Sequence, residues 1–168
     1  MTVATDSALV PMRVSKAVAL GGSDAISTFV VLDELGGDRH LVISVGESEA
    51  LALDAGLNGL QRGRPMTYEF MAALVRGLGG RVREVRLDRI VDGAYAATVE
   101  VEGPHGVTQV DARSSDALNL AVLTQAPVLV APGVLADCTA RQQADSTEAA
   151  LLRLALSAGP MTVRPVDR

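Results

Sequence analysis

Short β-branched segments separated by glycine-containing turns recur along this chain, so its fold must include a β-sheet. Long side chains alternate with small ones from Val14 to Leu20, which is typical of a half-buried strand. The turn signals Gly36-Gly37 and Asp92-Gly93 each separate two further strand-like segments, and they predict antiparallel hairpins. The predicted strands cover residues 14–20, 28–32, 40–45, 81–90, 94–102 and 107–112. We therefore expect N-terminal antiparallel strands followed by a three-stranded meander.

Helical periodicity interrupts this strand pattern, and each helical stretch is bounded by start or stop signals. The predicted helices cover residues 47–58 and 67–78, a segment from Ser114 or Ser115 to a point before Pro127, and residues 146–157. A short buried strand is expected at Val128–Val130. The predicted fold is α+β, a compact single domain in which a mixed or antiparallel sheet packs against about four helices. We expect a loose tail at residues 1–11, the main domain at residues 12–136 and a helical C-terminal extension at residues 137–168.

Composition removes several classes of function. The net charge of −5 argues against a broad basic face for nucleic acid, and the aromatic content of 2% argues against a base-stacking platform. The single Cys138 and the absence of a basic-then-apolar leader favour the cytoplasm, and every apolar run is too short for a membrane span. No phosphate-cradling glycine loop or other cofactor motif is present, so no organic cofactor is expected. One Cys and two His make a zinc site improbable, whereas carboxylates can hold Mg²⁺ or Mn²⁺.

The densest group of reactive side chains is Asp111-Ala112-Arg113-Ser114-Ser115-Asp116, where a strand gives way to a helix. Strand alternation directs Asp111 and Arg113 to one side, and the free N–H groups of the helix start can bind a phosphate. A purely structural interpretation is equally open. In that interpretation Ser114 or Ser115 caps the helix, Asp116 interacts with its dipole, and Asp111 pairs with Arg113.

A second candidate segment runs from Arg62 through Arg64 and Thr67 to Tyr68 and Glu69, just before and into a predicted helix. Guanidinium groups suit bidentate contact with phosphate, and Thr67 is a good N-cap. The structural alternative is a solvated basic loop followed by a capped helix. Glu49 in the preceding helix is open to two interpretations, a first-turn charge or a metal ligand.

These segments, taken in order, resemble the bifunctional nuclease domain family. The resemblance covers roughly residues 13–135 and is carried by Val45–Ala50, Arg64–Glu69, Asp92–Ala96, Asp111–Ala117 and Ala126–Val128. It implies a compact α+β fold, occurrence in bacteria and plants, self-association as a dimer or trimer, and metal-assisted cleavage of DNA and RNA. In such a site Asp111, Arg113, Asp116, Tyr68 and Glu69 would be catalytic. The substrate phosphates would be bound by Arg62, Arg64, Thr67, Ser114 and Ser115, and Mg²⁺ or Mn²⁺ by Glu49, Asp111 and Asp116.

The sequence departs from the family pattern in the segment that ends Thr67-Tyr68-Glu69, where the family has Thr-His-Asp, and at Ser114, where Pro is usual. A phenol with a pKa near 10 is a poor general base at neutral pH. Two functions therefore remain open. One is a low-specificity nuclease of reduced activity, and the other is a non-catalytic module that binds a nucleotide or another anion on the same fold.

Overall fold

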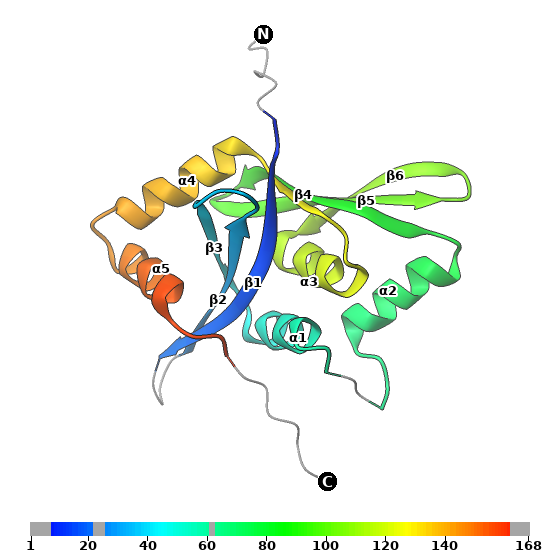
Figure 1. Cartoon of the computed structure of the whole chain (residues 1–168), viewed down its shortest axis with the longest axis horizontal. Coiled ribbons are helices and arrows are strands. Elements are labelled where there is room, and N and C mark those ends of the chain that lie inside the picture. The colour runs from blue at the N-terminus through cyan, green and yellow to red at the C-terminus, as the bar shows by residue number, and fades with distance from the viewer. Residues whose placement is uncertain (1–7, 22–25, 61–62, 162–168) are drawn as a thin grey trace.

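A computed structural model, described over residues 8–21, 26–60 and 63–161, has strands and helices in a mixed α+β arrangement (Figure 1). The strands are β1 (Val10–Gly21), β2 (Ile26–Glu34), β3 (His40–Val45), β4 (Arg81–Val91), β5 (Ala94–Gly103), β6 (Gly106–Arg113) and β7 (Val128–Val130). The helices are α1 (Glu47–Leu57), α2 (Thr67–Gly77), α3 (Ser114–Thr124), α4 (Pro132–Gln143) and α5 (Thr147–Ser157). The predicted α+β class is confirmed, and so are the N-terminal antiparallel strands and the meander formed by β4, β5 and β6.

The short strand β7 joins the two halves of the sheet, whose order is β3-β2-β1-β7-β4-β5-β6. β7 runs antiparallel to β1 and parallel to β4. Val10 and Pro11 already pair with Val130 and Leu129, so β1 begins inside the tail expected at residues 1–11. The three residues of β7 thus connect the N-terminal strands, through β1, to the meander, through β4.

A β-bulge in β1 breaks the alternation expected for residues 14–20. The register with β2 shifts between Val14 and Lys16, so that Val14 and the fully buried Ala17 both join the main core. Val18 then faces a second, smaller cluster on the opposite side of the strand. One extra residue in the strand lets β1 supply apolar side chains to both faces.

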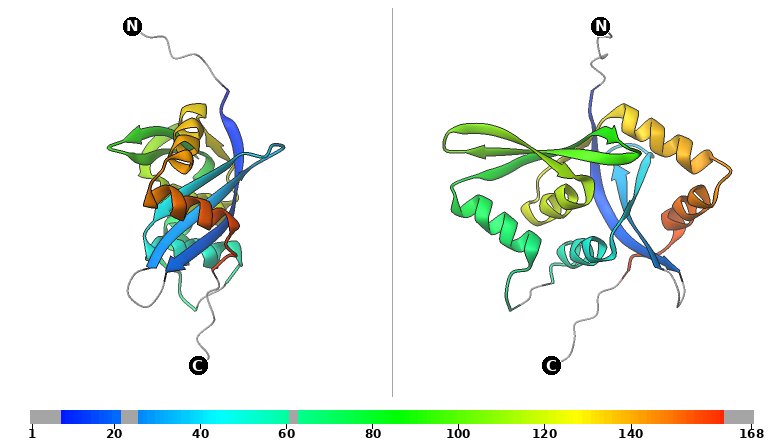
Figure 2. Two further views of the ribbon diagram at one scale, coloured as in Figure 1. Left: turned by 90° about the vertical axis from the view of Figure 1, so that its left-hand side faces the viewer. Right: turned by 180° about the vertical axis from the view of Figure 1, so that it is seen from behind.

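The helices divide between the two sides of β1. Seen from the front and from behind, α1, α2 and α3 lie on one side of β1, and α4 and α5 lie on the other (Figures 1 and 2). Leu53 of α1 and Leu118 of α3 are completely buried in the main core. These two helices therefore form the support on which the candidate site is built.

Helix α4 was not predicted, and it runs across the expected boundary between the main domain and the C-terminal extension. It begins at Pro132, so the expected boundary at residue 136 falls within it. Its Cys138 is fully buried; its Sγ accepts a hydrogen bond from the backbone N–H of Val42 on the edge strand β3, at 3.4 Å. Leu152 of α5 packs in the second cluster with Phe29. Both helices thus cover the sheet.

Helix α2 contributes least to the core, because none of its residues is fully buried. Phe70, Leu74 and Leu78 lie four residues apart and share one face, but they are 58%, 50% and 70% exposed. Met71 packs against the main core. Among the described residues, no helix combines the length and the apolar character needed to cross a membrane.

Candidate functional site

The start of α3 differs from its prediction. Arg113, with φ −66° and ψ 147°, occupies the N-cap position, and Ser114 and Ser115 lie inside the first turn as buried residues. No side chain caps this helix. The predicted serine cap is therefore wrong, because β6 continues up to Arg113 and the chain enters the helix directly after it. Likewise Met66, not Thr67, is the N-cap of α2.

Asp116 is the centre of the hydrogen-bond network at this junction. Its Oδ2 accepts a hydrogen bond from Nε of Arg113 at 2.8 Å, and its Oδ1 accepts one from Nη2 of Arg113 at 2.9 Å. The hydroxyl of Tyr68, on α2, donates to the same Oδ1 at 2.7 Å. Two residues separated by 48 positions in the chain therefore meet at one carboxylate.

Glu49 of α1 completes the group, which we call the Arg113 cluster: Glu49, Tyr68, Arg113 and Asp116. The Oε1 of Glu49 accepts a hydrogen bond from Nη2 of Arg113 at 3.2 Å. These side chains line one side of a cavity of about 590 Å³, together with Ser48, Leu51, Ala52, Met66, Thr67 and Met71. Three helices and the end of one strand thus converge on a cavity large enough for a small ligand.

Asn119 holds the two supporting helices of this site together. Its Nδ2 donates to the backbone oxygen of Glu49 at 3.1 Å and to that of Ser115 at 3.0 Å, and the residue is 2% exposed. Sequence reasoning assigned it no role. The available signal was a polar side chain in the middle of an otherwise apolar helical run, which usually needs a buried partner.

The electrostatics fix the protonation states of the cluster at neutral pH. Burial raises the pKa of the Tyr68 phenol, and its hydrogen bond to Asp116 raises it further. Burial alone would raise the pKa of Asp116, but the hydrogen bonds from Arg113 and Tyr68 outweigh it and lower that pKa below its usual value. Tyr68 is therefore a proton donor to an ionised Asp116, and the phenol does not act as a base.

Several predicted site residues lie away from the Arg113 cluster. Asp111 pairs with Arg89 of β4, its side chain is 85% exposed, and it does not line the cavity. The carboxylate of Glu69 accepts a hydrogen bond from the backbone N–H of Met66 at 2.7 Å, so it closes the first turn of α2. Arg64 is exposed in the segment before α2, and Arg62 lies outside the described residues.

The two serines that were predicted to bind phosphate are also absent from this cavity. Ser115 is buried in the first turn of α3, where its carbonyl accepts from Asn119. Ser114 lines a different cavity, between the sheet and the helices α4 and α5. The structure therefore brings together Glu49, Thr67, Tyr68, Arg113 and Asp116 from the predicted set.

The predicted metal ligands do not fit a Mg²⁺ or Mn²⁺ ion as they are arranged. Across the described ranges there is no group of three or more His, Cys, Asp or Glu side chains placed to hold a metal. Glu49 and Asp116 are bridged by the guanidinium of Arg113, and Asp111 is engaged with Arg89. Hard cations need several oxygen ligands around one point, whereas here a fixed positive charge occupies the space between the carboxylates.

Comparison with known proteins gives a consistent family. Residues 30–143, which include the whole Arg113 cluster, match the model of the bifunctional nuclease domain. An uncharacterized protein of Mycobacterium tuberculosis is 32% identical over 108 residues, which are 64% of this chain and 64% of that protein. Bifunctional nuclease 2 of Arabidopsis thaliana is 33% identical over 107 residues, and bifunctional nuclease 2 of Oryza sativa is 30% identical over 100 residues.

These matches cover 62% and 58% of this chain, but only 32% and 31% of the two plant proteins. The family match over residues 30–143 contains α1, α2 and the junction of β6 with α3, which are the elements that build the cavity. The segments that carry the sequence resemblance from residue 45 to residue 128 all lie within this family match. The chain belongs to the bifunctional nuclease domain family.

Proposed function

We propose that the Arg113 cluster is a low-specificity phosphodiesterase site that acts on DNA or RNA. The observation that supports this proposal is convergence: the segments that carry the family resemblance, 45–50, 64–69 and 111–117, place Glu49, Tyr68, Arg113 and Asp116 around one cavity. Reactive side chains that converge on one cavity from separate segments are the arrangement expected of a substrate site.

The chemistry of this proposal follows from the charges of the cluster. Arg113, with a side chain 69% exposed, can turn one face of its guanidinium to a phosphate and neutralise charge that develops during cleavage. Asp116 is ionised and can orient a water molecule or accept its proton. The exposed hydroxyl of Thr67 at the start of α2 is a further phosphate donor at the cavity wall.

The same geometry supports a reduced rate. A carboxylate whose pKa is lowered is a weak base, and the raised pKa of Tyr68 removes the phenol as an alternative base. The family pattern has His where this chain has Tyr68. We propose that the exchange to tyrosine weakens hydrolysis, and that any dependence on Mg²⁺ or Mn²⁺ requires Arg113 to move away from Glu49 and Asp116.

Cleavage of fluorescent single-stranded and double-stranded DNA and RNA, with Mg²⁺, Mn²⁺ or EDTA, tests the nuclease proposal. We expect Asp116→Asn to abolish cleavage, and Tyr68→His to increase it. Asp111→Asn is the matched control, because it neutralises a nearby carboxylate outside the cavity and should leave the rate unchanged. Equal cleavage by wild type and Asp116→Asn would contradict the proposal, and so would loss of cleavage in Asp111→Asn alone.

A second function, binding of a nucleotide or another anion without turnover, is favoured by one specific observation. Both oxygens of Asp116 already accept hydrogen bonds from Arg113 and Tyr68, which leaves little free basicity for catalysis. This alternative predicts stabilisation of the folded chain by about 2.7 kcal/mol at a hundredfold excess of ligand over its dissociation constant. A nucleotide panel that raises the melting temperature without being cleaved would select it over the nuclease.

We also propose that the chain acts in the cytoplasm as a homo-oligomer, a dimer or a trimer. An exposed apolar stripe runs along α2 and its two caps and supports self-association. It consists of Met66, Phe70, Leu74 and Leu78, each at least 50% exposed. Glu69 and Arg76 flank this stripe at similar distances from its middle, so two antiparallel copies of α2 would bring opposite charges together. The buried free thiol of Cys138 suits a reducing compartment.

A further inference from the structure

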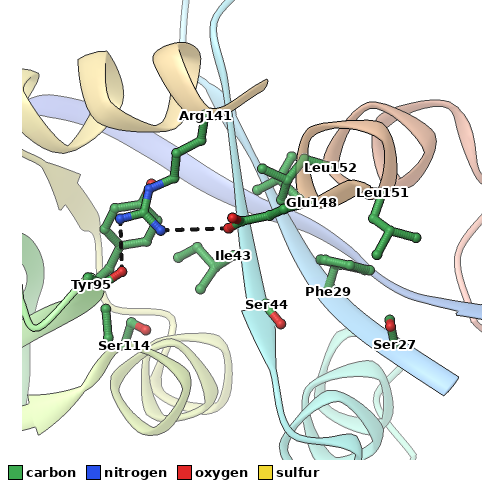
Figure 3. A pocket seen from close by; sticks show the side chains of 13 residues that line it. Ser27, Phe29, Ile43, Ser44, Tyr95, Ser114, Arg141, Glu148, Leu151 and Leu152 are labelled. Atoms are coloured by element: carbon green, nitrogen blue, oxygen red, sulfur yellow. Dashed lines mark hydrogen bonds and ion pairs between the residues drawn. The ribbon is translucent and has the colours of Figure 1, made fainter. Parts of the chain in front are cut away.

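A second cavity, of about 520 Å³, lies between the sheet and the two C-terminal helices (Figure 3). Its walls come from β2 and β3, from the turn between β4 and β5, from the start of α3, and from α4 and α5. It shares no lining residue with the cavity of the Arg113 cluster. Its volume is within the range of small-molecule sites, so its polar groups are of interest.

Ser114 supplies the first of these groups. The residue is 7% exposed, its hydroxyl has no hydrogen-bond partner among the described residues, and it lines this cavity. In the close view its oxygen points towards Ile43 and Ser44 across the cavity (Figure 3). Ser114 is also the first residue of α3, an 11-residue helix whose N-terminal N–H groups have no side-chain cap. A hydroxyl that is open to the cavity and has no protein partner, beside the positive end of a helix, favours a negatively charged ligand group.

Arg141 supplies the second group. Two of its three guanidinium nitrogens, Nε and Nη2, are engaged in hydrogen bonds with the protein. Its Nε donates to Asp137 at 2.6 Å, its Nη2 donates to the carbonyl of Gly93 at 2.9 Å, and its guanidinium lies 5.3 Å from the centre of the Tyr95 ring. The Tyr95 hydroxyl donates to the same Asp137 at 2.9 Å. These contacts orient the guanidinium before any ligand arrives.

The remaining nitrogen, Nη1 of Arg141, faces Glu148 of α5 at 3.7 Å, which is longer than a hydrogen bond. The side chain of Glu148 is 65% exposed, so it can leave this position at little cost. An incoming anion can therefore replace Glu148 at Nη1. Glu148 is a weak internal competitor for the place that the anion would take.

Apart from Ser27 and Ser44, much of the remaining wall is apolar. Phe29 and Leu152 are 4% and 3% exposed, and Leu151 and Ile43 extend the same surface. We propose that this cavity binds a small organic anion, in which a carboxylate or a phosphate monoester is carried by an aromatic or aliphatic body. The oxyanion contacts Ser114, the start of α3 and Arg141, and the apolar body lies against Phe29, Leu151 and Leu152.

Isothermal titration calorimetry on the full chain tests this proposal with phenyl phosphate and phenylacetate as probes, which distinguish the two anions. Benzyl alcohol is the neutral control of similar shape. We expect saturable binding of at least one anionic probe and none of the alcohol. Ser114→Ala should weaken the binding about tenfold, as expected for loss of a hydrogen bond to a charged group.

Two further variants have effects of opposite sign. Ser114→Pro removes both the hydroxyl and the N–H while it suits the fold, because proline is favoured at the first position of a helix and Arg113 already has the extended conformation that precedes proline. It should weaken binding at least as much as Ser114→Ala. Glu148→Gln should strengthen binding, because it removes the competing negative charge from Arg141.

Thr67→Val, in the other cavity and on α2, is the control for location and should bind both probes as the wild type does. Absence of saturable binding for both anionic probes would overturn the proposal. So would wild-type affinity in Ser114→Pro and Glu148→Gln. Weaker binding in Thr67→Val would also overturn it, because it would assign the probes to the cavity of the Arg113 cluster. These results do not depend on whether the chain cleaves nucleic acid.

Discussion

Removal of the Tyr68 hydroxyl isolates the contact that joins α2 to the start of α3. In Tyr68→Phe the ring keeps its packing, and Asp116 keeps both hydrogen bonds from Arg113, so no buried polar group is left unpaired. A hydrogen bond to a charged group contributes about 1.5–3 kcal/mol when buried. The Asp116 side chain is still 27% exposed, so we expect the free energy of unfolding to fall by about 1 kcal/mol.

The assay for this prediction is urea unfolding of wild type, Tyr68→Phe, Asp116→Ala and the double variant. The slope of the unfolding free energy against urea concentration should be the same in all four proteins, which is the control for two-state behaviour. The coupling energy between the two positions should be close to the cost of the single Tyr68→Phe change. Carbon-13 NMR should show a higher pKa for Asp116 in Tyr68→Phe, because one of the hydrogen bonds that lower it is gone. A coupling energy of zero would refute the assignment of this hydrogen bond.

Three further predictions concern other parts of the molecule. The pKa of Asp116 is lowered in the folded state, so its contribution to stability is present above the unfolded-state pKa of about 3.9 and is lost as the pH falls through the folded-state value. In Asp116→Asn the free energy of unfolding, measured with urea, should therefore depend less on pH in that window. Gly93→Ala should lower the free energy of unfolding by about 1–2 kcal/mol, because Gly93 has φ +78°. No atom lies within 4 Å of an added Cβ, so the loss comes from the backbone conformation and not from a clash. A loss near zero by thermal unfolding would count against the turn geometry. Leu74→Glu on the exposed stripe of α2 should change stability by less than about 0.5 kcal/mol but reduce the mass measured by light scattering, and an unchanged oligomer would exclude α2 as the interface.

The strand and helix pattern was readable from local signals. The Asp92-Gly93 turn has positive φ at both residues, 49° and 78°, which is the geometry that this dipeptide favours between two strands. Helix α3 was predicted with Leu118, Ala121 and Val122 on its buried face. Leu118 and Ala121 are at most 3% exposed, and Val122 is partly buried against the core. Such elements depend on neighbours within a few residues, so sequence alone identifies them.

Helix α4 and the outward face of α2 were not readable in the same way. Only Val134, Leu135 and Cys138 of α4 are buried, too few to stand out as a helical stripe. The apolar periodicity of α2 was correct, but periodicity cannot say whether a neighbour covers the stripe. Burial is a property of the assembled molecule.

The candidate site was likewise predictable in part from the sequence. The sequence determined that carboxylates, guanidiniums and hydroxyls gather in two segments, near Tyr68 and near Asp116, and that a tyrosine stands where the family has a histidine. Only the tertiary structure decided that Glu49 joins them, that Asp111 pairs with Arg89 instead, and that Ser114 faces another cavity. The physical reason is that a strand-to-helix junction turns successive side chains in different directions, and the partner each one meets comes from helices elsewhere in the chain.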